Sequence, residues 1–222
     1  GKDEVPPQFL EEFWTYTKKK YDKWVNLCES VEATLLASPG RTNWEWPNEL
    51  RAKYMDRNYL EWTHELAQVP GPYKTKFYST IDEKAWARRT ADKVGRHNIL
   101  WSLAGSSGHM VWPHLDEVLD WILAHLPETH VVLVGDEFCR ILQSGWDGYS
   151  KDGIFIEKEM NPRIHCKSGK WSIRESMSFA EVSDLIIGTE TGLMNAAGSL
   201  DVPKIVTLSH SREEMLTKHW KK

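Results

Sequence analysis

The sequence of 222 residues contains no long hydrophobic run. Its longest apolar stretches, such as Val131 to Val134, are far too short to span a bilayer. The first residues include the charged Lys2, Asp3 and Glu4 and precede a helical pattern, so they do not match a secretory signal peptide. We therefore expect a protein without a transmembrane segment.

Cysteine is also scarce, with three residues in the whole chain. Cys28, Cys139 and Cys166 are widely spaced and form no C-x-x-C pair. An odd number at such spacings excludes a disulfide framework, and a cytoplasmic location is therefore expected. The net charge of −4 does not suit a broad nucleic-acid surface, which needs a basic face, although backbone N–H groups could still hold a small anion locally.

Several motifs of catalytic chemistry are missing. The nine histidines form no H-E-x-x-H pattern or other metal-ligand spacing. The chain has no Asp-x-Asp motif, so a metal-bridged diphosphate is not favoured, and no metal site is predicted. The Gly-x-Ser-x-Gly elbow is absent too, which removes the most obvious serine-hydrolase interpretation.

Tryptophan, in contrast, is abundant, with 12 residues. An exposed indole can stack on a sugar ring, whereas a buried one adds area to the core. We favour the core role for most of these side chains.

The first part of the chain combines helix and strand patterns. Apolar residues near one stripe predict an amphipathic helix from Pro6 to Lys20. A β-rich run predicts a buried strand from Tyr21 to Leu27. Asn58 can cap a helix that reaches Gln68. We assign residues 1–78 to a partial, smaller N-terminal α/β region and linker.

From residue 79 onward, short apolar strands alternate with helices. Ser79 or Thr80 is expected to cap the first of these helices, and Ser178 a later one, with Glu181 at capping-box spacing. The predicted strands are Asn98–Leu103, His130–Val134, Gly153–Glu157, Asp184–Gly188 and Pro203–Leu208, and further helices are Pro113–Leu126, Glu137–Leu142 and Gly192–Leu200. This alternation predicts a Rossmann-like parallel sheet, covered by helices on both faces, over residues 79–222.

Three polar loops follow predicted strands. Ligands of open α/β sheets bind beyond the carboxyl ends of the strands, so these loops are candidates for a site. In the first, Ala104–Gly108, small residues and the hydroxyls of Ser106 and Ser107 suit a phosphate, although a plain tight turn is the favoured explanation of this loop taken alone. In the second, Gly135–Glu137, an acidic residue could accept bonds from ribose hydroxyls, or simply cap a helix.

The third loop is Gly188-Thr-Glu-Thr-Gly192, which leads into a predicted helix. Gly192 would let this helix begin close to a diphosphate, with free N–H groups directed at it. The carboxylate of Glu190 makes better sense as an acceptor for sugar or ribose hydroxyls. The alternative is an ordinary helix start with an acidic cap.

Three stretches resemble the glycosyltransferase family 9 heptosyltransferases. They are Ile99–Pro113, with its Trp-Pro helix start, Val131–Glu137, and Met177–Val206. The family transfers heptose from ADP-heptose in lipopolysaccharide biosynthesis. It has the GT-B arrangement of two Rossmann-like domains, and its C-terminal domain binds the nucleotide sugar. Tyr21–Leu27 is similar to a strand late in the family's N-terminal domain.

The resemblance also implies roles for individual residues. Ser106 and Ser107 would contact the diphosphate, Glu137 would lie near the ribose, and Met177 would line the adenine pocket. The sugar and phosphate would be held by Glu190, Thr191 and Gly192.

The chain departs from the family pattern at three of its positions. Glu190 stands where the family has Asp, and Asn195 where it has His. The family's phosphate-loop Lys falls near His109 or Met110, so His109 or Arg174 would have to supply the cation that stabilises the leaving diphosphate. These departures leave both the sugar and the nucleotide open.

The expected function is an inverting, metal-independent sugar transfer from a nucleotide diphosphate sugar, with an ADP-sugar first among the donors and heptose as one candidate sugar. The acceptor would be a glycan or a lipid-linked, lipopolysaccharide-type glycan, which would allow peripheral contact with a membrane. No cofactor beyond the donor substrate is expected. Inverting transfer needs a general base, which we could not assign.

Two alternatives stay open. The chain could be a non-catalytic nucleotide- or glycan-binding module, derived from such an enzyme or a piece of one, or a structural α/β domain whose loops bind nothing. The sequence resembles a piece of an enzyme or a shortened relative, and we predict no helix after Ser211 that crosses back to the first region.

Overall fold

The computed structural model describes residues 5–27, 31, 35, 40, 42–105, 108–151, 154–157, 161–209 and 211–221, with the side chains of residues 7, 109, 144–151 and 154–157 left out. The chain forms two compact units. The first comprises Gly1–Lys74 and Arg212–Lys218, and the second comprises Thr75–Ser211 and His219–Lys222. The boundary at Lys74 lies close to the one expected at residue 78.

The second unit is built on one parallel sheet of five strands, in the order β5-β2-β1-β6-β7. The strands are β1 (His97–Ser102), β2 (Thr129–Val134), β5 (Ile164–Cys166), β6 (Leu185–Thr189) and β7 (Lys204–Thr207). From central β1 the chain adds strands first on one side and then on the other. The strand order therefore reverses between β1 and β6, which is the usual ligand position in this class of fold.

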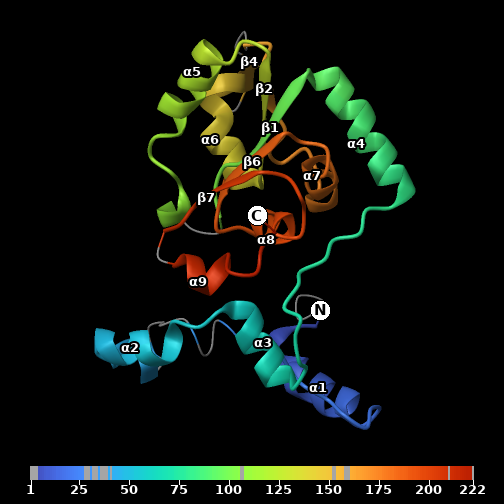
Figure 1. Cartoon of the computed structure of the whole chain (residues 1–222), viewed down its shortest axis with the longest axis vertical. Helices are drawn as coiled ribbons and strands as arrows, with labels where there is room; N and C mark the ends of the chain where they lie inside the picture. Colours follow the sequence, from blue (N-terminus) through green and yellow to red (C-terminus); the bar gives the residue numbers. More distant parts are fainter. Residues whose placement is uncertain are drawn as a thin grey trace. The chain divides into compact units, whose positions relative to one another are not determined.

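Helices cover both faces of this sheet. They are α4 (Ile81–Val94), α5 (Leu115–His125), α6 (Glu137–Asp147), α7 (Ile173–Ala180) and α8 (Gly192–Ala197), with a short 3-10 turn η4 (Gly108–Met110) before α5. Figure 1 shows α5 and α6 on one side of the strands, and α4 and α7 on the other. The predicted Rossmann-like α/β domain is confirmed.

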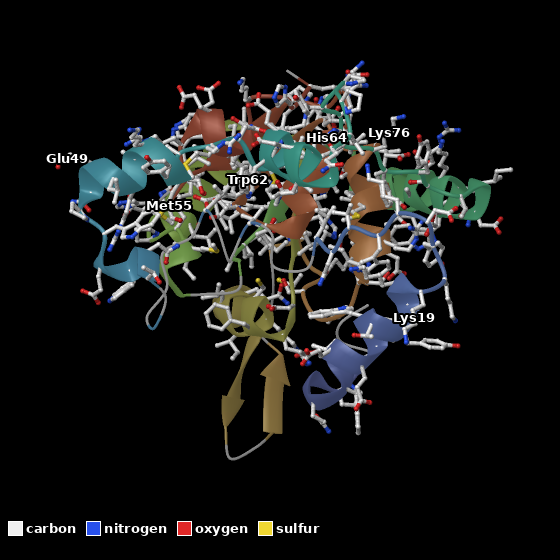
Figure 2. The ribbon with its side chains drawn as sticks, turned by 90° about the horizontal axis from the view of Figure 1, so that it is seen from below. Lys19, Glu49, Met55, Trp62, His64 and Lys76 are labelled. Atoms are coloured by element: carbon white, nitrogen blue, oxygen red, sulfur yellow. The ribbon has the colours of Figure 1, made fainter. Side chains whose placement is uncertain are left out.

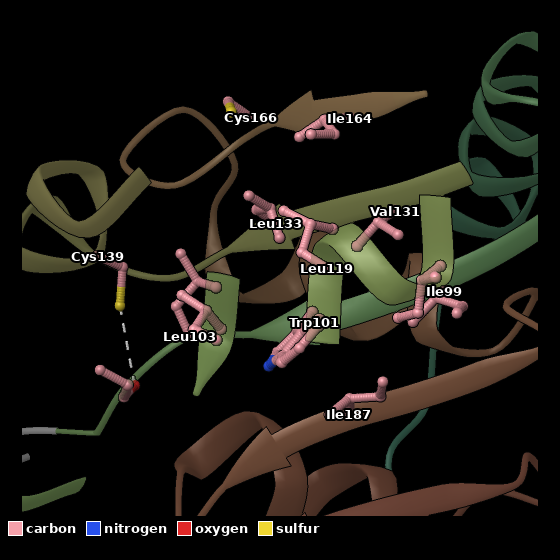
Figure 3. Close-up of a cluster of buried hydrophobic side chains, with 13 residues drawn as sticks. Ile99, Trp101, Leu103, Leu119, Val131, Leu133, Cys139, Ile164, Cys166 and Ile187 are labelled. Carbon is pink, nitrogen blue, oxygen red and sulfur yellow. Dashed lines mark hydrogen bonds between the residues drawn. The ribbon is translucent and has the colours of Figure 1, made fainter. Parts of the chain in front are cut away.

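Alternate residues of the strands build the core beneath α5. Trp101 and Leu133 lie in the middle of the sheet and pack against Leu119 of α5 (Figure 3). The Trp101 side chain is 2% exposed, and Leu119 is 1% exposed. For Trp101, the core role expected of the tryptophans is confirmed.

The helix caps were predicted with mixed success. Thr80 forms a full capping box with Glu83 at the start of α4, as expected. The predicted cap at Ser178 is wrong, because Ser178 lies inside α7 and is 1% exposed. The cap is Ser172, which forms its own box with Glu175. Both serines have Glu three residues later, and Ser178 can pack in the interior because it is small.

One predicted strand lies outside the main sheet. The run expected at Gly153–Glu157 forms β4 (Ile154–Glu157), which pairs antiparallel with β3 (Gly148–Lys151) in a separate hairpin. The edge of the main sheet beside β2 is formed by β5, which the sequence did not single out. With three residues, β5 is too short to give a clear periodicity.

The first unit is helical in its described residues. It contains η2 (Pro7–Phe9), α1 (Leu10–Lys18), η3 (Thr42–Glu45), α2 (Asn48–Met55), α3 (Tyr59–Ala67) and α9 (Glu213–Leu216). Figure 2 labels Met55 at the end of α2, and Trp62 and His64 on α3. The helix predicted from Pro6 and the cap at Asn58 are confirmed.

Two predictions for this unit are wrong. Tyr21–Leu27 has no strand conformation, because the described residues supply no neighbouring strand to complete its hydrogen bonds. A short helix, α9, does follow Ser211 and belongs to the first unit. There Asn58 Nδ2 donates to the Glu214 carbonyl at 2.9 Å, and Lys218 pairs with Glu61 at 2.6 Å.

A pair of histidines links β2 to β5, with 3.1 Å between His130 Nδ1 and His165 Nε2. Burial lowers the pKa of both, that of His165 from 6.5 to about 4. The unfolded chain therefore binds more protons than the folded one over this range. The stabilising contribution of the neutral pair is complete above pH 6.5 and is lost as the pH falls toward about 4.

We therefore expect the urea midpoint to fall between pH 7 and pH 5, and to fall less in a His165→Phe variant. Urea unfolding curves at both pH values measure this difference. An equal fall in the two proteins would mean that other groups carry the acid sensitivity.

Candidate functional site

A pocket of about 440 Å³ opens at the carboxyl edge of the sheet, beyond the ends of the neighbouring strands β1 and β6. It is entirely within the second unit. Its lining residues come from the ends of β1 and β2, the start of α7 and the junction between β6 and α8: Ser102, Ala104, Gly105, Val134, Gly135, Asp136, Trp171, Ile173, Ser176, Glu190, Thr191, Gly192 and Leu193. This is the edge at which the sequence predicted a site.

Thr191 fixes the start of α8 beside β1. Its Oγ1 accepts a hydrogen bond from the Met194 N–H at 3.2 Å and lies 3.3 Å from Ser102 Oγ. Gly188 permits this close packing, since a Cβ there would lie 2.8 Å from Met194 Cγ. The hydroxyls of Ser102 and Thr191 are thereby held together on the pocket wall.

Gly192 has a different role from Gly188. Apart from its chain neighbours and the backbone of its own helix, a Cβ at Gly192 would meet no protein atom within 4 Å. The absent side chain therefore leaves free space at the pocket wall and serves no packing purpose. This geometry suits the close approach of a ligand to the backbone, which is the role predicted for Gly192.

The loop after β2 brings Asp136 to the pocket. Asp136 Oδ1 accepts from the Cys139 N–H at 3.0 Å and so caps α6. Gly135 has φ +155°, and a Cβ there would lie 2.2 Å from Cys139 Sγ, so this position requires glycine. The neighbouring Glu137 packs against Gly169 and is not among the lining residues. The role of Glu137 beside a ribose stays a prediction. The sequence had indicated this loop as part of a site, but not Asp136 in particular.

Apolar side chains also line the pocket. The Trp171 ring is held by Trp86 and Phe179, each with its centroid 5.1 Å away. Ile173, the first residue of α7, also lines the pocket and is 56% exposed. The sequence had suggested Met177 for a base pocket, but on α7 it is Ile173 and Ser176 that line the cavity. The sequence did not predict Trp171 as a site residue, because the turn before α7 carries no motif that indicates a ligand.

Glu190 lies between the pocket and the loop after β7. Its Oε1 accepts from the Ser209 N–H at 2.6 Å, Ser209 Oγ at 3.1 Å and the Ser211 N–H at 3.4 Å. Its Oε2 accepts from Ser211 Oγ at 2.7 Å. Both carboxylate oxygens are therefore occupied by the protein's own donors, a feature that the sequence did not predict.

The described lining of the pocket is acidic. It contains Asp136 and Glu190 but no Lys, Arg or His. Arg174, a candidate for the missing cation, instead pairs with Glu83 at 2.5 and 2.7 Å and donates to the Tyr78 carbonyl. This pairing lowers the pKa of Glu83 to about 2. The suggestion that Arg174 would face a diphosphate is therefore wrong, because its guanidinium is paired with Glu83 of α4.

The other predicted residues have different outcomes. Ser106 and Ser107 lie outside the described residues, and His109 is described in its backbone only, within η4. Asn195 is exposed on α8 and is not among the lining residues. The structure places Glu190, Thr191 and Gly192 at one pocket, and the ligand-binding role of each predicted residue stays a prediction.

Within the described ranges, no cluster of three His, Cys, Asp or Glu side chains is arranged to hold a metal ion. The described helices also include none with the length and apolar character needed to cross a bilayer. Metal dependence and cellular location stay predictions.

Comparisons with known proteins find similarity at the level of structure. No family sequence model matches the chain, and no curated protein sequence does. The ADP-heptose LPS heptosyltransferase II of E. coli matches 70% of this chain at 15% identity, with a TM-score of 0.52. A family 9 glycosyl transferase from Veillonella parvula DSM 2008 matches 75% at 14% identity, with a TM-score of 0.57.

The fold is therefore like that of glycosyltransferase family 9. The resemblance proposed from the sequence is confirmed at the level of the fold. The match covers 46% of the E. coli chain and 47% of the Veillonella chain, so this chain spans less than half the length of either. Function does not follow from fold, and has to be argued from the site.

Proposed function

We propose that this chain provides the nucleotide-sugar-binding part of a glycosyltransferase. The observation that carries the proposal is the pocket beyond the carboxyl ends of β1 and β6, at the reversal of strand order in a family 9-like fold. Its volume of about 440 Å³ lies in the usual range for small-molecule sites. In such folds this position accepts nucleotides.

The apolar and the polar lining residues of the pocket suit the two chemical parts of such a ligand. Trp171 and Ile173 offer an apolar surface for a nucleobase, and a Trp ring supplies the largest flat area. The free space at Gly192 and the hydroxyl of Ser102 suit the diphosphate. Asp136 and Glu190 are acceptors for sugar or ribose hydroxyls.

The finer assignments rest on the resemblance. We propose an ADP-sugar as the donor, a glycan of lipopolysaccharide type as the acceptor, and an inverting transfer that needs no metal. The sugar need not be heptose, because Glu190 and Asn195 stand where the family has Asp and His. The general base is not assigned to any residue of this chain.

Calorimetric titration with ADP, GDP and UDP, with and without Mg²⁺, tests the donor site. We expect ADP to bind, and to bind equally well without Mg²⁺. If none of the three binds, the proposal is wrong. A Glu190→Ala variant that bound the corresponding nucleotide sugar normally would remove Glu190 from the site.

The charge of the pocket favours a second candidate, a nucleotide- or glycan-binding module without catalysis. No cation among the described lining residues faces a leaving diphosphate, whose charge a transferase must stabilise. An assay of labelled sugar transfer separates the candidates. Transfer supports the enzyme, whereas tight binding without transfer supports the module.

A further inference from the structure

Glu190 connects the candidate donor pocket to one particular segment of the chain. Among the residues that the structure describes, Ser209 and Ser211 donate hydrogen bonds to its carboxylate, and we call these two residues the serine strap. They supply two hydroxyl and two backbone N–H donors, at 2.6 to 3.4 Å. Hydrogen bonds to an ionised acceptor are the stronger kind, so this attachment contributes substantially to holding the strap.

The strap stands at the exit of the second unit. Directly after Ser211 the chain enters Arg212–Lys218, which belongs to the first unit. That segment is fastened there, because Arg212 pairs with Asp56 at 2.8 Å and Lys218 with Glu61 at 2.6 Å. The serine strap is therefore the last part of the second unit before the chain enters that segment.

The strap hydroxyls also resemble a ligand in chemistry. Ser209 Oγ donates to one carboxylate oxygen, and Ser211 Oγ donates to the other. Two neighbouring hydroxyls of a sugar would offer the same pair of donors. Glu190 lines the pocket, so such a ligand and the strap compete for one carboxylate.

We propose that Glu190 is a positioning residue that exchanges the serine strap for two hydroxyls of the donor sugar. The proposal rests on the proposed function of the pocket. Binding of a nucleotide sugar then loosens the strap, which directly precedes Arg212 in the chain. A nucleotide without its sugar leaves the strap attached. By linkage, loosening the strap strengthens sugar binding by the same factor.

Amide hydrogen exchange of the full chain tests the exchange of partners. The readout is the Ser209 and Ser211 amides, measured without ligand, with saturating ADP, and with saturating ADP-glucose or ADP-heptose. Loss of a hydrogen bond to a charged group predicts about tenfold faster exchange with the ADP-sugar. ADP alone should leave the exchange unchanged.

A double variant, Ser209→Ala with Ser211→Ala, removes the competing hydroxyls and keeps the backbone donors. We expect it to bind the ADP-sugar about tenfold more tightly and to bind ADP as before. Ser199→Ala is the matched control, since Ser199 Oγ donates to the Ala196 carbonyl at 2.8 Å, away from Glu190. It should change neither affinity.

The outcomes separate the two proposals. If neither ADP nor the ADP-sugars bind, the proposed function and the exchange of partners both fail. If the ADP-sugars bind but the strap amides exchange at the same rate as without ligand, the exchange of partners is overturned and the donor site stands. Faster exchange with ADP alone would also overturn it, because the sugar would then not be the competitor.

Discussion

Replacing Gly192 by Val should weaken binding of ADP by about 5- to 150-fold, the effect of about 1–3 kcal/mol of overpacking. The added side chain meets no protein atom within 4 Å of its Cβ and extends into the space at the pocket wall. A ligand that approaches the backbone there loses that space. Calorimetric titration of the variant and the parent measures the change.

The free energy of unfolding of the Gly192→Val variant shows whether the substitution disturbs the fold. With no protein atom to displace, its free energy of unfolding should stay within about 1 kcal/mol of the parent value. Lys93→Val, at an exposed position in the last turn of α4 and outside the pocket lining, should leave ADP binding unchanged. ADP binding that survived Gly192→Val intact would place the nucleotide elsewhere.

Replacing Trp101 by Ala should lower the free energy of unfolding by about 3–5 kcal/mol, as for other large-to-small changes in cores. The side chain is 2% exposed and lies between the neighbouring strands and α5. Its removal combines lost burial with a cavity that the rigid parallel strands cannot close. Urea unfolding followed by circular dichroism gives the difference.

Trp121 provides the matched comparison for Trp101. It lies on α5 and is 55% exposed, with its ring stacked on His125 at a centroid distance of 4.6 Å. Trp121→Ala should therefore cost much less than Trp101→Ala, within about 1 kcal/mol of the parent. Equal losses for the two variants would show that the core beneath α5 is not the main source of stability.

The contrast between Gly188 and Gly192 explains how the site is made. Both glycines flank the Thr-Glu-Thr segment, yet Gly188 allows α8 to pack against β1, while Gly192 leaves the pocket wall open. The first is a requirement of the fold and the second a property of the site. Only the structure separates them, because the motif has the same residue at both ends.

The repetition of apolar strands and helices was sufficient to predict the second unit. Strands β1, β2, β6 and β7 and most helices were expected near their observed positions, because their apolar runs are bounded by glycine, proline and capping residues. Predictions failed where a strand-like run had no neighbouring strand to pair with, or where two serines matched the same capping pattern. Tyr21–Leu27 found no neighbouring strand among the described residues, and Ser178 had the same spacing to a Glu as Ser172.

By itself, then, the sequence determined the α/β class of the second unit and the edge at which its polar loops meet, since strand periodicity and loop chemistry are local properties. The tertiary structure decided which residues of those loops face the pocket. In the structure, Trp171 and Asp136 line the pocket, and Arg174 pairs with Glu83. Glu190 is hydrogen-bonded to Ser209 and Ser211. These outcomes depend on contacts between segments far apart in the chain, which no local pattern encodes.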